Sequence, residues 1–259
     1  MSTIMMIHGM WGGSWYWDNY IRYFSARGYQ CLAPTLRYHE INPEDEPDPR
    51  LGTTSLLDYA RDLEAEIDKL PEKPVLMGHS MGGLLAQILA ARGLASAAVL
   101  LTPASPAGIF ALKPSVLKTF WSVMNRWGFW KKPMRIPFQA ASYSILNMLP
   151  PEVQKEKYAR FVYESGRAAF EIGFWIIDGQ KASRVDEKQV QCPLLVLAGG
   201  GDKITPSSVI KKVAEKYGDQ ATYQELAGHG HWLVEEDGWD DVAAEVHDWL
   251  KKQNSLFAI

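Results

Sequence analysis

Short apolar runs alternate with longer amphipathic segments along this chain. Five apolar runs stand out, and a sixth, less apolar run follows the same rhythm. They cover residues 3–7, 29–34, 75–77, 97–101, 194–198 and 222–226. Continuous apolar runs of this length are typical of strands that are buried on both faces of a parallel sheet. We therefore predict a sheet of about six strands.

The segments between these runs have helical periodicity. In residues 55–70, apolar side chains recur at a spacing that gives the helix one apolar face, and Pro71 ends the segment. Four more segments are helical candidates: residues 16–27, 82–92, 206–217 and 239–252. Strands that alternate with helices predict an α/β fold, with a mostly parallel open sheet and flanking helices, because parallel neighbours require crossover connections.

Two stretches interrupt the alternation. Residues 42–52 are acidic and rich in proline, so they predict an exposed loop, either a solvated connector or a rim of the active-site mouth. Residues 104–189 are far longer than a crossover helix requires. We predict that they form a helical insertion, cut into pieces by its prolines. The α/β core would then comprise residues 1–103 and 190–259.

Composition excludes several classes of protein. Lys and Arg number 27 and Asp and Glu number 30, so no overall positive field is available to bind nucleic acid. No apolar run approaches the ~20 residues that span a bilayer, so no integral membrane contact is expected. Residues 4–7 lack a basic flank and read as a strand, not a signal peptide. The two cysteines, Cys31 and Cys192, lie far apart and are expected to be reduced, as in a cytoplasmic protein.

The segment Gly78-His79-Ser80-Met81-Gly82 carries the strongest chemical signal. It lies between an apolar run and a helical segment, which is the context that a G-x-S-x-G nucleophile elbow requires. Small residues allow the sharp turn that exposes the serine. The pattern predicts Ser80 as a nucleophile. The alternative is a turn that serves packing only.

The segment His8-Gly9-Met10-Trp11-Gly12-Gly13 directly follows the first predicted strand. A glycine-rich turn at this place can direct backbone N–H groups toward an oxyanion, and acyl transfer needs at least two such donors. We predict the N–H groups of Met10 and Met81 as these donors, with His8 anchoring the loop. An ordinary tight loop is the alternative.

Candidate acid and base residues follow the last two predicted strands. Asp202 follows three glycines after the fifth strand, where it can orient a histidine or can cap the next helix. After the last strand, His231 and His229 compete for the role of general base, and we favour His231. We expect His79 to pack in the elbow and His39 and His247 to lie at the surface. No cluster has metal-ligand spacing, so neither a metal nor an organic cofactor is expected.

The elbow, the His-Gly loop and the chain order Ser, Asp, His resemble the α/β-hydrolase superfamily. The resemblance covers nearly all of the chain outside residues 104–189. It implies Ser80 as nucleophile, His231 as base and Asp202 as the residue that orients the base, and it implies that the insertion is a cap over the site. The short start before the His-Gly loop looks like the compact branch that holds plant methylesterases and hydroxynitrile lyases.

These expectations together describe a serine hydrolase that cleaves a carboxylic ester or lactone of a hydrophobic small molecule. Aromatic side chains make adaptable apolar pocket walls. The candidate substrate-binding residues are Trp11, Trp121, Trp127, Trp130, Phe138 and Trp175. A C–C bond hydrolase or a lyase could use the same triad, and a ligand receptor could use the same fold. The protein is expected as a monomer or homodimer, and the segment Lys118–Lys132 could touch a membrane surface or a dimer partner.

Overall fold

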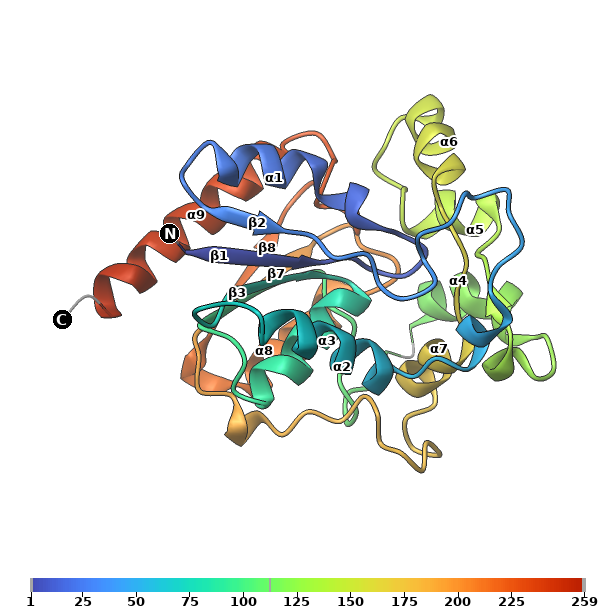
Figure 1. Ribbon diagram of the computed structural model, residues 1–259. Helices are drawn as coiled ribbons and strands as arrows, with labels where there is room; N and C mark the ends of the chain where they lie inside the picture. Colours follow the sequence, from blue (N-terminus) through green and yellow to red (C-terminus); the bar gives the residue numbers. More distant parts are fainter. Residues whose placement is uncertain (1, 112, 258–259) are drawn as a thin grey trace.

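The computed structural model describes residues 2–111 and 113–257, which form an α/β fold around one parallel sheet (Figure 1). Its six strands have the order β2-β1-β3-β4-β7-β8, and every neighbouring pair is parallel. They are β1 (Thr3–Ile7), β2 (Gln30–Leu32), β3 (Val75–His79), β4 (Ala97–Leu101), β7 (Leu194–Gly199) and β8 (Ala221–Leu226). The six predicted strands and the α/β class are thereby confirmed.

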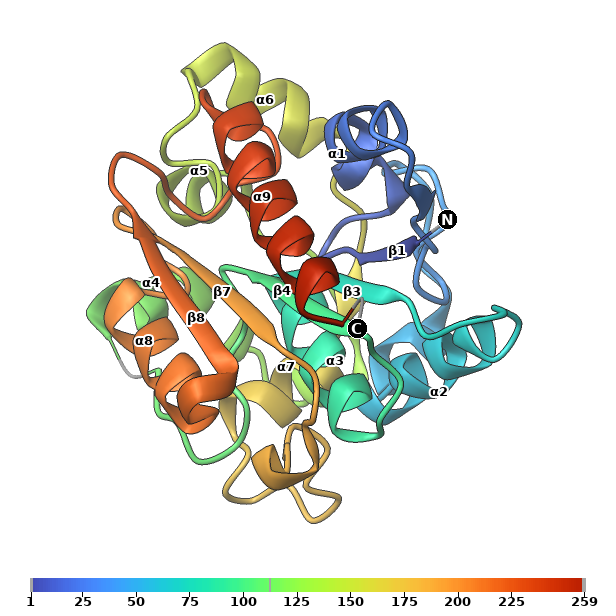
Figure 2. The ribbon, with the colours of Figure 1, turned by 90° about the vertical axis from the view of Figure 1, so that its left-hand side faces the viewer.

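Helices cover both faces of this sheet. Helices α1 (Asp18–Ser25) and α9 (Trp239–Phe257) lie on one face. Helices α2 (Leu56–Ile67), α3 (Met81–Ala91) and α8 (Ser207–Lys216) lie on the other (Figures 1 and 2). Helix α2 begins where the sequence predicts, because Ser55 and Asp58 form a reciprocal capping box. Helix α3 is apolar nearly all round because almost all of its residues are buried.

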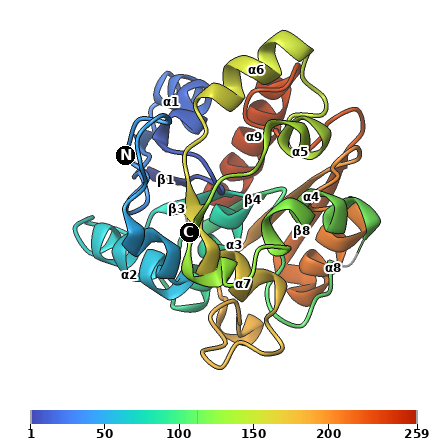
Figure 3. The ribbon, with the colours of Figure 1, turned by 90° about the vertical axis from the view of Figure 1, so that its right-hand side faces the viewer.

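The segment between β4 and β7 gathers at the carboxyl ends of the strands (Figures 1 and 3). It contains α4 (Pro114–Met124), α5 (Phe138–Ser144), α6 (Pro151–Ala159) and α7 (Gly166–Gly173). A small antiparallel ladder of β5 (Pro133–Met134) and β6 (Glu164–Ser165) interrupts the helices. The ladder was not expected, since strands of two residues leave no periodic signal. The prolines here begin elements: Pro150 is the N-cap of α6.

Five short 3-10 helices complete the described part of the chain. They are η1 (Ser14–Trp17), η2 (Pro49–Thr53), η3 (Phe129–Lys131), η4 (Glu187–Gln189) and η5 (Gly218–Gln220). Residues 42–48 form the predicted loop, but the η2 helix corrects the end of that prediction, because its residues Leu51 and Gly52 are buried. A Cβ atom at Gly52 would lie 2.6 Å from the backbone of Lys132, so this helix packs closely against the segment between β4 and β7.

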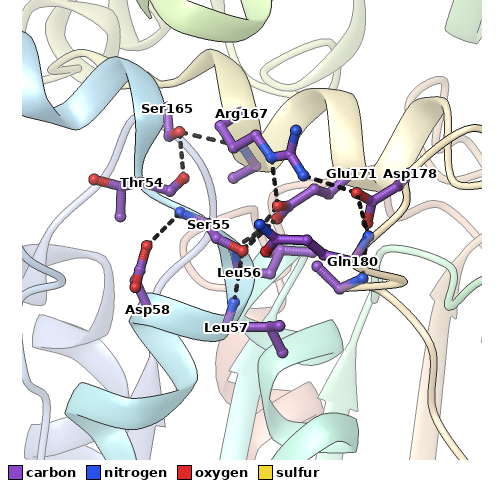
Figure 4. A network of polar contacts seen from close by, with 12 residues as sticks. Thr54, Ser55, Leu56, Leu57, Asp58, Ser165, Arg167, Glu171, Asp178 and Gln180 are labelled. Carbon is purple, nitrogen blue, oxygen red and sulfur yellow. Dashed lines mark hydrogen bonds and ion pairs between the residues drawn. The ribbon is translucent and has the colours of Figure 1, made fainter.

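A buried polar network fastens α7 to the start of α2 (Figure 4). The Glu171 carboxylate accepts hydrogen bonds from Ser55 Oγ (2.8 Å) and from the backbone N–H of Leu56 (2.8 Å). Arg167 bridges Glu171 and Asp178, at 2.7 Å from each. Since buried carboxylates need such partners, the network fixes the orientation of α7 relative to the core.

Both cysteines are free thiols. No helix among the described residues is long and apolar enough to cross a membrane. Within the same residues, no group of three His, Cys, Asp or Glu side chains is arranged to hold a metal ion.

Candidate active site

Ser80 stands at the turn between β3 and α3 with a backbone φ of 54°. A positive φ is strained for serine and persists only where neighbours hold it. The end of β4 supplies that restraint: Ser80 N–H donates to the Leu101 carbonyl (3.0 Å), and Ala104 N–H donates to the Ser80 carbonyl (2.9 Å). A Cβ atom at Gly82 would lie 2.0 Å from the Ile7 carbonyl oxygen, so only glycine fits there.

The loop that follows β1 lies directly against this turn. A Cβ atom at Gly9 would stand 3.0 Å from the Ser80 Cβ. The imidazole of His8 fixes the loop, because its Nε2 accepts from Leu36 N–H (3.0 Å) and its Nδ1–H donates to the Gly9 carbonyl (2.8 Å). Met10 and Met81 line the same cavity as Ser80. The structure thus brings both predicted oxyanion residues to the predicted nucleophile.

His231 is paired with Asp202 in the buried interior. Its Nδ1 lies 2.7 Å from Asp202 Oδ2, and both side chains are almost completely buried. Asp202 Oδ1 accepts from the N–H groups of Ile204 (2.7 Å) and Thr205 (2.8 Å). These bonds hold the loop before α8, whose N-cap is Pro206, so Asp202 does not cap the helix.

His229, the competing base candidate, points elsewhere. Its Nδ1 lies 3.4 Å from Glu236 Oε2, whereas Asp202 is paired with His231. The carboxylate of Glu236 instead accepts the N–H groups of Gly230 (2.7 Å) and Trp232 (2.9 Å), on both sides of His231. Glu236 therefore fixes the backbone that carries His231.

Sequence reasoning missed Glu236 and Thr205. Thr205 Oγ1 lies 2.7 Å from Asp202 Oδ2 and 3.2 Å from His231 Nδ1. An acid five positions after the favoured histidine, and a hydroxyl three positions after the favoured acid, were the available signals. Neither spacing has a chemical meaning until the loops are folded.

Ser80 opens into an apolar cavity of about 210 Å³. Residues before and within α4 and α7 form much of the wall, including Ile109, Phe120 and Ile172. Two predicted substrate-binding residues, Trp11 and Trp175, line this cavity.

The other four predicted substrate-binding aromatics lie away from it. Trp121 and Trp127 are 68% and 88% exposed. Trp130 lines a separate open groove, and Phe138 packs against Tyr158 with ring centroids 5.2 Å apart. The reason is the orientation of α4, which turns Val116, Phe120 and Met124 toward the cavity and Trp121 outward.

His39 corrects the prediction of a surface residue. It is buried, and its Nε2 lies 3.1 Å from Glu164 Oε2 in β6, while Tyr59 donates to Glu164 Oε1 (2.8 Å). Burial alone would lower the pKa of His39, but the Glu164 charge and hydrogen bond raise it. Burial alone would raise the pKa of the Glu164 carboxyl, but the His39 charge lowers it below its usual value. The two side chains form a buried ion pair beside the His8 ring, whose centroid is 5.2 Å from that of His39.

Two other buried histidines are held neutral. Burial, with the His39 charge, lowers the pKa of His8 to about 3. Burial, with His231 nearby, lowers the pKa of His79 to about 3. His79 Nε2–H donates to the His231 carbonyl (2.8 Å), so it packs in the elbow as predicted.

We expect stability to fall as the pH decreases below the unfolded histidine value of 6.5. Below that pH the unfolded chain binds protons at His8 and His79. The folded chain does not bind them until about pH 3, because the pKa of each histidine is lowered to about 3. Each histidine costs about 1.4 kcal/mol of unfolding free energy per pH unit in this window. Urea unfolding at a series of pH values from neutral to mildly acid measures the slope. His79→Gln is expected to reduce the slope by about one proton; an unchanged slope would contradict the assignment.

Comparison with known proteins shows which family has this fold. The alpha/beta hydrolase family matches residues 4–245. No curated protein matches the chain by sequence. A similar solved structure is a Paleococcus ferrophilus monoacylglycerol lipase, with 20% identity, a TM-score of 0.71 and coverage of 97% of this chain and 94% of that one. A Thermogutta terrifontis esterase has 22% identity, a TM-score of 0.68 and coverage of 98% of this chain and 90% of that one. An Arabidopsis methylesterase has 14% identity, a TM-score of 0.69 and coverage of 99% of this chain and 100% of that one. At these identities the structures show a shared fold. The chain belongs to the alpha/beta hydrolase family.

Proposed function

We propose that the protein is a serine hydrolase that cleaves a carboxylic ester or lactone of a hydrophobic small molecule through Ser80, His231 and Asp202. Membership of a hydrolase family supports a carboxylic ester hydrolase. One observation carries the proposal further. Ser80 opens into an apolar cavity whose wall includes Thr205, and Thr205 contacts both members of the buried Asp202–His231 pair.

The reaction has two half-reactions. Ser80 Oγ attacks the acyl carbonyl while His231 Nε2 accepts its proton, and Asp202 holds the imidazole with its other nitrogen protonated. The N–H groups of Met10 and Met81 hold the oxyanion. His231 then protonates the leaving alcohol, or the ring oxygen of a lactone. Water, activated by the same histidine, releases the acid and restores Ser80.

The insertion of residues 104–189 acts as the cap in this proposal. Its α4 and α7 carry much of the cavity wall. The hydrogen bond from Leu56 N–H to the Glu171 carboxylate holds α7 against the start of α2. The N–H group of Val162 donates to the Trp11 carbonyl (2.9 Å), which ties the insertion to the oxyanion loop as well.

The cavity wall supports a hydrophobic acyl group. Its polar groups are few: the hydroxyls of Ser80, Ser105 and Thr205 and the indoles of Trp11 and Trp175. The buried indole N–H of Trp11 has no partner in the described part of the chain. An apolar wall with a few polar groups is typical of small-molecule sites. The free thiols of Cys31 and Cys192 support a cytoplasmic enzyme.

A series of p-nitrophenyl esters, from acetate to long acyl chains, tests this function. We expect release of p-nitrophenol with an optimum at medium chain length, because the cavity volume is about 210 Å³. Ala169→Phe, which adds volume to the wall on α7, is expected to lower kcat/KM for the longer esters at least ~10-fold and for acetate by less than ~3-fold. If the folded protein cleaved no ester in the series, the proposal would fail, and C–C bond hydrolysis or a lyase reaction would be tested next.

A further inference from the structure

Large apolar side chains are exposed on one face of the molecule. Eight of them are well exposed in the part of the chain described, and seven belong to the segments around α4 and α7. These seven are Phe110, Leu117, Trp121, Trp127, Phe174, Ile176 and Ile177. We call this set the α4–α7 face, and Figure 3 views the molecule from its side.

Contacts join the two segments into one surface. An open groove is lined by Met124 and Trp127 from one segment and by Phe174 and Ile177 from the other. The rings of Phe110 and Trp175 lie 5.1 Å apart. A contiguous exposed apolar surface of this kind marks an interaction site.

The segment that carries α4 and η3 is positively charged, although the whole chain carries −3. The sequence contains no Asp or Glu from residue 73 to residue 151. Around α4 and η3, the exposed cations of that stretch are Lys113, Lys118, Arg126, Lys131 and Lys132. In the second segment Lys181 and Arg184 are exposed together with Asp186, whereas Asp178 is buried on Arg167.

The active-site cavity opens on the same face. Phe110, Leu117 and Phe174 are among the exposed residues, and all three also line the cavity that contains Ser80. A partner on the α4–α7 face would therefore cover or feed the entrance to the cavity.

We propose that the α4–α7 face docks on an anionic lipid surface. Tryptophan side chains settle at the boundary between headgroups and acyl chains, and lysine and arginine beside them bind anionic headgroups. A second copy of the chain fits less well, because a two-fold contact would set each cluster of cations against its own copy. On the basis of the proposed function, the hydrophobic ester then enters the cavity from the lipid.

Vesicle flotation tests the docking without relying on activity. The full chain and its Ser80→Ala variant are mixed with vesicles of phosphatidylcholine alone, or with about one third phosphatidylglycerol. We expect both proteins to float with the anionic vesicles, and salt to weaken the binding. Trp121→Ala with Trp127→Ala is expected to weaken partitioning at least fivefold.

A matched pair of charge variants isolates the face. Lys131→Glu with Lys132→Glu is expected to weaken binding about 25-fold or more, at roughly fivefold per cation. Lys211→Glu with Lys212→Glu changes the net charge equally on exposed positions of α8 and is expected to bind as the wild type does. Absence of binding to anionic vesicles, or equal losses in the two charge variants, would overturn the proposal. A dimer in light scattering that dissociates in the Trp127→Ala variant would also overturn the proposal. Ester hydrolysis in solution is scored separately, so a failed docking leaves the proposed function standing.

Discussion

Ser80→Ala is expected to reduce kcat toward the best p-nitrophenyl ester by at least ~10⁴-fold. In the proposed mechanism the hydroxyl is the only group that forms the acyl-enzyme, and the activity that remains is the contribution of binding and of the oxyanion donors. The fold should be retained, because alanine and serine are equally strained at a φ of 54° and the backbone bonds of the elbow do not involve the side chain. Steady-state kinetics and thermal unfolding of the same preparation measure both.

A serine at the far end of the sheet provides the control. Ser96 is exposed just before β4 begins, so Ser96→Ala should keep full activity. A fluorophosphonate probe should add its mass to the wild type and to Ser96→Ala, but not to Ser80→Ala. Labelling that persists in Ser80→Ala would place the reactive serine elsewhere and would contradict the assignment.

Asp202→Asn is expected to reduce kcat by about 10³- to 10⁴-fold with little effect on folding. An amide at this position can donate its N–H₂ to His231 Nδ1, which moves the imidazole proton to Nε2. In the proposed mechanism, no nitrogen is then left to accept the Ser80 proton. The bonds from Ile204 and Thr205 N–H to the 202 side chain survive, because the amide oxygen still accepts them. Kinetics with the same ester series measure the loss.

Thr205→Val separates orientation from packing at this site. It removes the hydroxyl that lies 2.7 Å from Asp202 Oδ2 while it keeps the volume, so a loss of about tenfold is expected, far smaller than that of Asp202→Asn. If Asp202→Asn kept activity within tenfold of the wild type, Asp202 would not be the residue that orients the base.

Local signals sufficed for the sheet and the elbow. Apolar runs identify buried strands at positions such as Ala97–Leu101, because neighbours in sequence share one environment. The elbow is also local: a Cβ atom at Gly78 would lie 2.2 Å from the carbonyl oxygen of Gly82, four residues further on, so glycine is required there. These features depend on the backbone within a few residues, which a sequence pattern records.

The sequence did not predict which side chains from distant segments contact each other. His229 and His231 share one motif, and only the closed loop shows that His231 meets Asp202 while His229 meets Glu236. His39 looked like a surface residue because its partner, Glu164, lies 125 positions away on a strand of two residues. No periodicity connects them.

The sequence by itself determined the order of the candidate catalytic residues along the chain: a serine on a tight turn, then an acid and a histidine on later loops. The tertiary structure decided which aromatic residues face the cavity. The helix that begins at Pro114 has a polar side that carries Ser115, Lys118 and Ser122. Phe120 and Trp121 both lie outside that side, so the helical pattern alone leaves Trp121 a candidate for the cavity. Packing against α5, and shared walls with α7, choose the inward side and leave two tryptophans in solvent. That choice depends on contacts between distant segments, which exist only once the chain has folded.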